Sequence, residues 1–204
     1  MRRKFLIVAA VLFLLGLIAL STSRVFQHSR SESTDSSHVL GSEDARVHIV
    51  GYFDLEAPES REAWEKIFHL REQYADRLSL EFRHYPITSI HSYAIIAAVA
   101  AEAAGKQDKF WEFIDILWNQ QDVWHAVSDP KMLFVQYAQQ VGIEENERFL
   151  DDMEQQRLTM RILSDLNDAH TQGVSWETPF LVNGKPTSTD VVQLAVERIL
   201  LKPR

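Results

Sequence analysis

The residues that could do chemistry are limited first by an absence, because the chain contains no cysteine. Thiol–disulfide exchange, disulfide cross-links, cysteine metal sites and a thiolate nucleophile are therefore excluded for this chain by itself. Ser60 offers a hydroxyl at the start of a predicted helix, but a serine nucleophile needs a base within hydrogen-bond reach, and no neighbouring pattern supplies one. The simpler interpretation of Ser60 is a polar residue in a first helical turn.

The eight histidines form no HExxH motif or comparable pair, and we predict neither a metal site nor a cofactor. His84 and His91 flank a predicted loop near the core, where we interpret them as ordinary polar residues. Most of the tryptophans fall on helical faces and are predicted to be core. Trp176 instead lies in a loop, where it could contact a partner.

These residues must be positioned by an alternation of strands and helices. The β-branched and aromatic stretch 46–53 predicts a buried strand, 58–75 an amphipathic helix and 78–85 a second strand, which together imply a right-handed parallel crossover. A long helical block follows, then a short strand ending in an Asn-Gly turn, and a last helix with Asp190 as its N-cap. The expected ranges of these later elements are 91–104, 108–121, 129–141 and 144–172 for the block, 179–182 for the strand, 183–184 for the turn and 190–201 for the last helix.

Several short patterns occur in the order and spacing of a known family. They are GSEDA at 41–45, GYFD at 51–54, FRHYP at 82–86, the alanine-rich stretch 97–105 with KFW at 109–111, and GVSWETPFLVNG at 173–184. In these features the chain resembles the DsbA-like branch of the thioredoxin superfamily. The resemblance implies an α/β, thioredoxin-like fold with a helical insertion, over residues 39–204.

The chain departs from that family at the motif on which its activity depends. The family has Cys-Pro-x-Cys at the start of the first helix, where this chain has Ala57-Pro58-Glu59-Ser60. Alanine and serine can neither form nor resolve a mixed disulfide. The family is one of protein disulfide oxidoreductases, so we expect this member to be redox-inactive and these four positions to be vestigial.

The segment around Thr178-Pro179 resembles the proline loop of the family. The resemblance implies a cis Thr178-Pro179 bond beside the Pro58 helix, with the Thr178 backbone offered to an extended peptide and Trp176 or Phe53 in apolar contact. The other interpretation is that the turn persists because the fold needs it.

A second kind of site would use carboxylates. Because the family places the proline loop beside the first helix, Glu59 and Glu177 could converge, and with Asp54, Glu56 or His84 could form an acid–base or metal site. The spacing matches no standard metal motif. The alternative is that Glu56, Glu59 and Glu62 complement the helix dipole on a solvated face.

The N-terminus predicts a membrane location. Residues 1–4 are basic, and 5–23 form an uncharged stretch of 19 residues, about 28 Å as a helix, which is close to the thickness of a bilayer core. The basic flank favours a cytoplasmic N-terminus, with a flexible linker at 24–38 and an extracytoplasmic domain at 39–204. A cleavable signal peptide, with Ala19-Leu20-Ser21 near its end, is the alternative, after which the domain would be secreted.

Charge restricts the partners. Beyond Arg24 the chain has 17 basic and 29 acidic residues, and such a domain is repelled by phosphate backbones, so we expect no nucleic-acid partner. Three functions remain open. The first is a binding module for an extended polypeptide or an envelope protein, in a chaperone-like or assembly role. The second is a non-redox enzyme using Ser60 or Glu59 and Glu177, and the third is a purely structural subunit.

We expect residues 5–23 to remain in the mature protein as a single membrane anchor, because the apolar run exceeds the core of an ordinary signal peptide. Intact-mass spectrometry of the protein isolated from its native membrane checks this. A mature N-terminus near Thr22 would show that a signal peptide had been removed.

Overall fold

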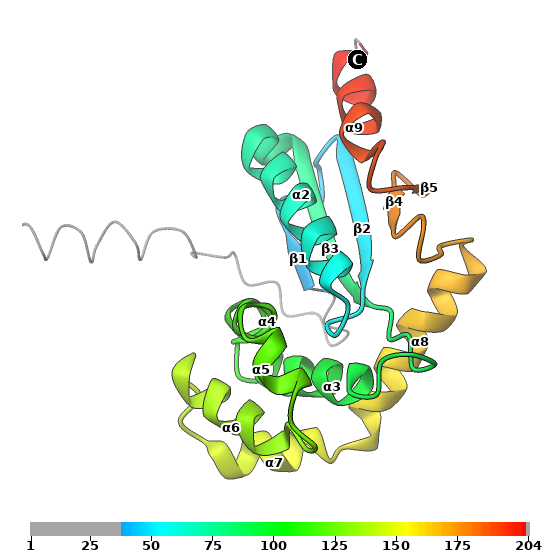
Figure 1. Ribbon diagram of the computed structural model, residues 1–204. Coiled ribbons are helices and arrows are strands. Elements are labelled where there is room, and N and C mark those ends of the chain that lie inside the picture. The colour runs from blue at the N-terminus through cyan, green and yellow to red at the C-terminus, as the bar shows by residue number, and fades with distance from the viewer. Residues whose placement is uncertain (1–37, 203–204) are drawn as a thin grey trace, which may run out of the picture. The chain divides into compact units, whose positions relative to one another are not determined.

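A five-stranded sheet organises the protein, for which a computed structural model describes residues 38–202 (Figure 1). The strand order is β1-β3-β2-β4-β5, and the central pair β2–β3 is parallel, whereas every other pair is antiparallel. The strands are β1 (His38–Leu40), β2 (Val47–Phe53), β3 (Leu78–His84), β4 (Phe180–Val182) and β5 (Lys185–Thr187).

The predicted strand–helix–strand crossover is confirmed. Helix α2 (Pro58–Tyr74) begins with its proline in the first turn and is followed by a 3-10 turn at Ala75–Arg77 that leads into β3. Helices α2 and α9 (Val192–Leu201) pack on one face of the sheet, while the end of α8 packs against Tyr52 and Leu181 on the other face. Both faces are therefore covered, which is why the central strands are apolar on both sides.

A block of helices lies at the end of the sheet where β2 and β3 finish, and the long helix α8 leads from it back toward β4 (Figure 1). The predicted helical insertion is therefore confirmed. Its helices are α3 (Ala94–Gly105), α4 (Phe110–Asn119), α5 (Gln121–His125), α6 (Lys131–Gln140), α7 (Asn146–Met153) and α8 (Gln156–Thr171).

Two predicted helix boundaries are wrong. The helix expected over 144–172 is two helices, α7 and α8, because Gln155 has an extended backbone and its side chain donates to the buried Asp152 carboxylate at 2.8 Å. Asp190 does not cap α9, which begins after Val191 with backbone hydrogen bonds to the carbonyl of Ser188. The short elements β1 and α5 were not predicted.

Within residues 38–202, no helix is both long and apolar enough to cross a bilayer. The predicted anchor at 5–23 and all but the last residue of the predicted linker at 24–38 lie outside the described residues.

The core is centred on the ring of Phe53, which contacts the rings of Trp64, Phe82, Trp118 and Phe180. Gly51 lies on the same strand face two residues earlier. A Cβ atom at Gly51 would lie 2.4 Å from Cζ of Phe53 and 3.3 Å from Cδ1 of Ile67. Glycine is therefore required here by close packing rather than by backbone conformation.

We expect Gly51→Ala to lower the free energy of unfolding by about 1–3 kcal/mol, because the added methyl overpacks the Phe53 cluster. Urea unfolding measures it. The matched control is the double variant Gly51→Ala with Phe53→Leu, in which the clash is relieved. Its loss of unfolding free energy should be clearly smaller than the sum of the losses in the two single variants. Simple additivity would contradict the steric explanation.

Candidate functional site

The turn between β2 and α2 is held by the buried carboxylate of Asp54. Its Oδ1 accepts the backbone N–H of Glu56 at 2.8 Å, and its Oδ2 accepts the backbone N–H of Ile87 at 2.7 Å. The Nδ1 atom of His91 lies 2.8 Å from the same Oδ2, and it is the donor because a carboxylate only accepts. Asp54 therefore fastens the loop after β3 to the end of β2.

Glu56 also holds neighbouring segments to this turn, namely the end of the loop after β3 and helix α5. Its buried carboxylate accepts the backbone N–H of Tyr93 at 2.7 Å and the Nδ1–H of His125, on α5, at 2.9 Å. Gln121, also on α5, donates to the carbonyl of Leu55 at 2.9 Å. The prediction that Glu56 lies on a solvated helix face is thus wrong, because the side chain turns inward to satisfy these donors.

The first residue of the vestigial motif, Ala57, is closed off from solvent. Ala57 has an exposed fraction of 0%, whereas Pro58 and Glu59 are exposed and Ser60 is half-buried. The Ser60 hydroxyl accepts the backbone N–H of Asp54 at 3.1 Å. Among the hydrogen bonds of residues 38–202, none joins Ser60 to a histidine or carboxylate side chain that could activate it.

The proline loop differs from the prediction. No peptide bond in the described part of the chain is cis, so the expected cis Thr178-Pro179 bond is wrong. The turn closes on itself instead, because the N–H of Thr178 donates to the carbonyl of Ser175 at 3.1 Å, and their hydroxyls lie 3.0 Å apart. The Thr178 N–H is therefore occupied. The Pro179 carbonyl accepts the N–H of Tyr52 at 2.9 Å, which brings the loop to the end of β2.

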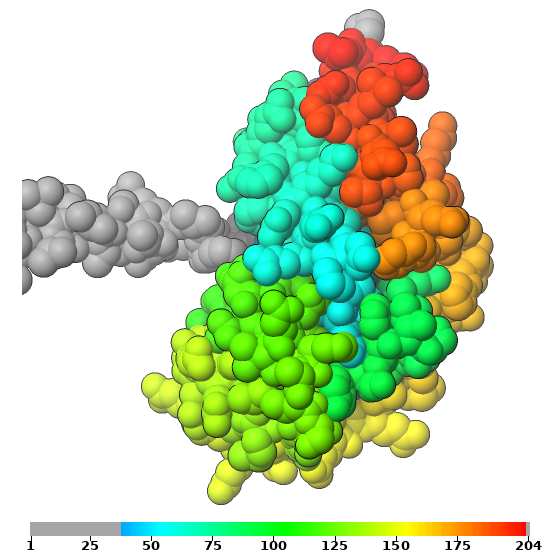
Figure 2. Space-filling model, viewed as in Figure 1, coloured from blue at the N-terminus to red at the C-terminus, as the bar shows by residue number. Residues whose placement is uncertain are grey.

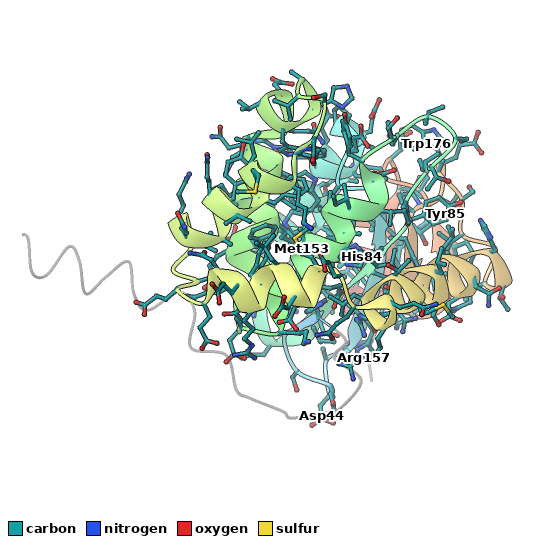
Figure 3. All side chains as sticks on the ribbon, turned by 90° about the horizontal axis from the view of Figure 1, so that it is seen from below. Asp44, His84, Tyr85, Met153, Arg157 and Trp176 are labelled. Carbon is teal, nitrogen blue, oxygen red and sulfur yellow. The ribbon has the colours of Figure 1, made fainter. Side chains whose placement is uncertain are left out.

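The remaining predicted residues have different surroundings. Trp176 is 49% exposed and lies at the surface, on the loop between α8 and β4 (Figure 3), whereas Phe53 is buried and so is unable to touch a partner. Glu59 and Glu177 are both exposed, and their convergence stays a prediction. His84 is bonded to Glu102 in a separate cluster rather than to the turn. Within residues 38–202 no group of three or more acidic or histidine side chains is placed to hold a metal ion.

Sequence reasoning missed the two carboxylate–imidazole pairs at this turn, Asp54 with His91 and Glu56 with His125. The available signal was the pair of acidic residues in the segment that directly follows a buried strand, since buried carboxylates need donors from elsewhere. Neither histidine is close to its partner in sequence, because the separations are 37 and 69 residues.

Comparison with known proteins gives the family. A family model described as thioredoxin matches residues 33–200, most of the chain. The chain belongs to the thioredoxin family. With its sheet, helical insertion and absence of cysteine, it is a DsbA-like thioredoxin-fold protein that lacks the paired cysteines, as the resemblance implied.

Solved structures share the fold. A thioredoxin-like oxidoreductase from Silicibacter pomeroyi is 25% identical with a TM-score of 0.64, over 84% of this chain and 95% of that one. Oxidised BdbD from Bacillus subtilis is 20% identical with a TM-score of 0.68, over 85% and 98% of the two chains.

The curated relatives carry a different name. Na(+)/H(+) antiporter NhaA 3 of Salinispora tropica is 35% identical over 153 residues, and NhaA of Herminiimonas arsenicoxydans is 32% identical over 148 residues. These matches cover 74% and 72% of this chain but only 22% of each relative. The chain thus spans about a fifth of the length of the curated relatives it matches.

The closed turn makes a prediction about accessibility that the cysteine-free background allows to be tested cleanly. In the single variants Ala57→Cys, Glu59→Cys and Ser60→Cys, we expect a thiol at 59 to react rapidly with an aromatic disulfide reagent, and a thiol at 60 more slowly. The thiol at 57 should react only when the protein unfolds, because access controls thiol exchange. Rapid labelling at position 57 in the folded protein, with stability unchanged, would contradict a closed turn.

Proposed function

We propose that this chain is a non-redox binding module that docks on a protein partner through the end of the sheet where the family's redox motif would lie. One observation carries the proposal: the turn is closed around Ala57, while each of three segments bonded to that turn exposes a large apolar side chain. An enzyme based on Ser60 loses support, because the Ser60 hydroxyl is engaged with the Asp54 backbone.

The docking surface, here called the apolar rim, consists of Ile90, Val123 and Trp176, which are 70%, 48% and 49% exposed. Ile90 lies in the loop that Asp54 holds through its neighbour His91, and Val123 lies on α5 between the residues that bind Leu55 and Glu56. Trp176 precedes Pro179, whose carbonyl accepts the N–H of Tyr52. The three side chains are therefore carried by segments anchored within residues 52–56.

Such a surface suits protein recognition. Exposed tryptophan is among the most frequent anchors of protein interfaces, and two further large apolar side chains are exposed on segments bonded to the same turn. The segments that present the apolar rim are held by buried hydrogen bonds, so little ordering entropy is lost when a partner binds. Figure 2 shows the turn side by side with the helical block and the loop after β3.

The proposed partner is an integral membrane protein of the transporter class. The similarity of this chain to one part of sequences named Na(+)/H(+) antiporters supports that choice. A membrane anchor at 5–23 would hold the domain at the bilayer, on the extracytoplasmic side. The strong acidic excess of the domain favours a partner whose facing surface is basic around an apolar centre.

A site-specific photocrosslinker tests the proposal in the full chain within its native membrane. We expect a photocrosslinker at Val123 to capture a multispanning membrane protein, and Ile90→Ala with Trp176→Ala to lower the yield about tenfold or more, as loss of interface anchors does. The control is Met132→Ala on α6, whose exposed fraction of 62% lies between those of Trp176 and Ile90, and which should leave the yield unchanged. Equal yields in all variants, or capture of soluble proteins alone, would contradict the proposal.

A further inference from the structure

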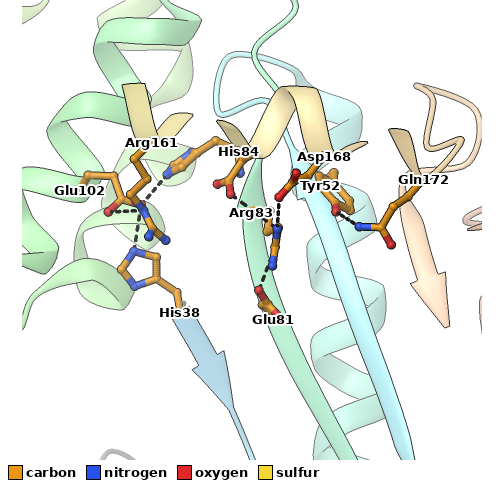
Figure 4. Close-up of polar contacts among 10 residues, drawn as sticks. His38, Tyr52, Glu81, Arg83, His84, Glu102, Arg161, Asp168 and Gln172 are labelled. Atoms are coloured by element: carbon orange, nitrogen blue, oxygen red, sulfur yellow. Dashed lines mark hydrogen bonds and ion pairs between the residues drawn. The ribbon is translucent and has the colours of Figure 1, made fainter. Parts of the chain in front are cut away.

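Glu102 is a single charged residue in the otherwise apolar helix α3, and it is 3% exposed. It is compensated by side chains from three other elements (Figure 4). Its Oε1 lies 2.9 Å from Nε2 of His38 on β1 and 3.0 Å from Nε2 of His84 on β3. Its Oε2 lies 3.1 Å from Nε of Arg161 on α8. This four-residue cluster thus joins two helices of the block, α3 and α8, to the strands β1 and β3.

The protonation states follow from the geometry. Burial acts to raise the pKa of Glu102, but the attraction of His38 and the hydrogen bonds that His38 and His84 donate outweigh it and hold that pKa well below its usual value. Glu102 is therefore an ionised acceptor, and both histidines must donate from Nε2. Arg161 already supplies the one positive charge that balances the carboxylate. The cluster is neutral in total when both imidazoles are neutral.

A further proton has no good place in this cluster. The buried Nδ1 of His84 has no hydrogen-bond partner in the described part of the chain, so an added N–H there would lack an acceptor. The backbone of the same residue is bonded to Asp165, the other acidic group at this position. The ring of His38 is stacked on Phe110 with centroids 3.3 Å apart, beside Trp111, which is an apolar environment for a charge.

We propose that His38, His84, Glu102 and Arg161 form an acid-sensitive latch, which holds β1 on the sheet at neutral pH and releases it when the pH falls. β1 is an edge strand of only three residues, paired to β3 from His38 opposite Phe82 to Leu40 opposite Leu80. So short a ladder depends on side-chain anchors, and the imidazole of His38 supplies one through its hydrogen bond to the buried Glu102.

The sign of the effect follows from His38. Burial lowers its pKa below the usual 6.5, the attraction of Glu102 opposes this in part, and the charge of Arg161 lowers it further. When β1 is released, the pKa of His38 returns to its usual value, so the released imidazole binds a proton at pH values where the latched imidazole stays neutral. The latch is therefore complete above about pH 6.5 and weakens as the pH falls below it, with an opening constant that rises by up to about tenfold per pH unit.

Hydrogen exchange of the full chain in detergent micelles tests the latch at pH 7.5, 6.5 and 5.5, with rates corrected for intrinsic exchange. Successive N–H groups of an edge strand point in opposite directions, so only alternate residues donate across the pair of β1 and β3. We expect the protection of the backbone amides that join β1 and β3 to fall by up to tenfold between pH 6.5 and 5.5. Protection inside α9, which has no contact with the cluster, should stay constant. Constant protection of β1 over the whole range would overturn the proposal.

The variant His38→Gln separates titration from simple loss of packing. Its amide still donates to Glu102 but does not titrate, so β1 should stay protected at pH 5.5. The control His69→Gln, at an exposed side chain on α2, should behave like the unmodified chain. If His38→Gln loses protection with pH as the unmodified chain does, the proposal is wrong. If that variant does not fold, the proposal is judged from the pH dependence of β1 protection in the unmodified chain and in His69→Gln, which should both lose protection as the pH falls.

Discussion

The arrangement of the helical block depends on one buried charge, the carboxylate of Glu102. An unpaired carboxylate in a protein interior costs several kcal/mol, so α3 can only lie where donors reach it. Its partners come from β1, β3 and α8, elements widely separated along the chain. A shift of α3 by one residue would carry the carboxylate about 100° around the helix, away from all of them. The charge thus fixes the register of the block on the sheet, which apolar contacts among alanines would specify weakly.

The same principle operates at the turn after β2. Asp54 and Glu56 accept backbone N–H groups from the loop between β3 and α3, and each also holds a histidine. Relatives with cysteines need a thiol that solvent and substrate can reach at this turn. Here Ala57 is buried under its neighbours, and the carboxylates of Asp54 and Glu56 hold the adjacent loop in place. In this chain the cysteine-free turn is therefore closed at Ala57.

The fold was predictable from the sequence because its signals are local. The β-branched residues of 47–53, the proline at the start of α2 and the Asn183-Gly184 turn each favour one structure within a few residues. The polar clusters were not predictable, because their hydrogen bonds join residues that are far apart in the sequence. His38 and Glu102, for example, are 64 residues from each other. The cis Thr178-Pro179 bond was an inference from resemblance alone, and the Ser175–Thr178 turn closes without it. The helix break at Gln155 likewise depends on Asp152, whose burial no periodicity reveals.

The direction of β1 has a mechanical consequence. The strand enters the domain at His38 and runs antiparallel to β3, so tension on the preceding chain is applied first at the end of the ladder that His38 occupies. A load applied at one end of an edge strand and across its axis breaks the hydrogen bonds one after another, beginning at that end. The bond between His38 and Glu102 would then bear the first load. An electrostatic contact in the interior would set the force at which the domain begins to yield.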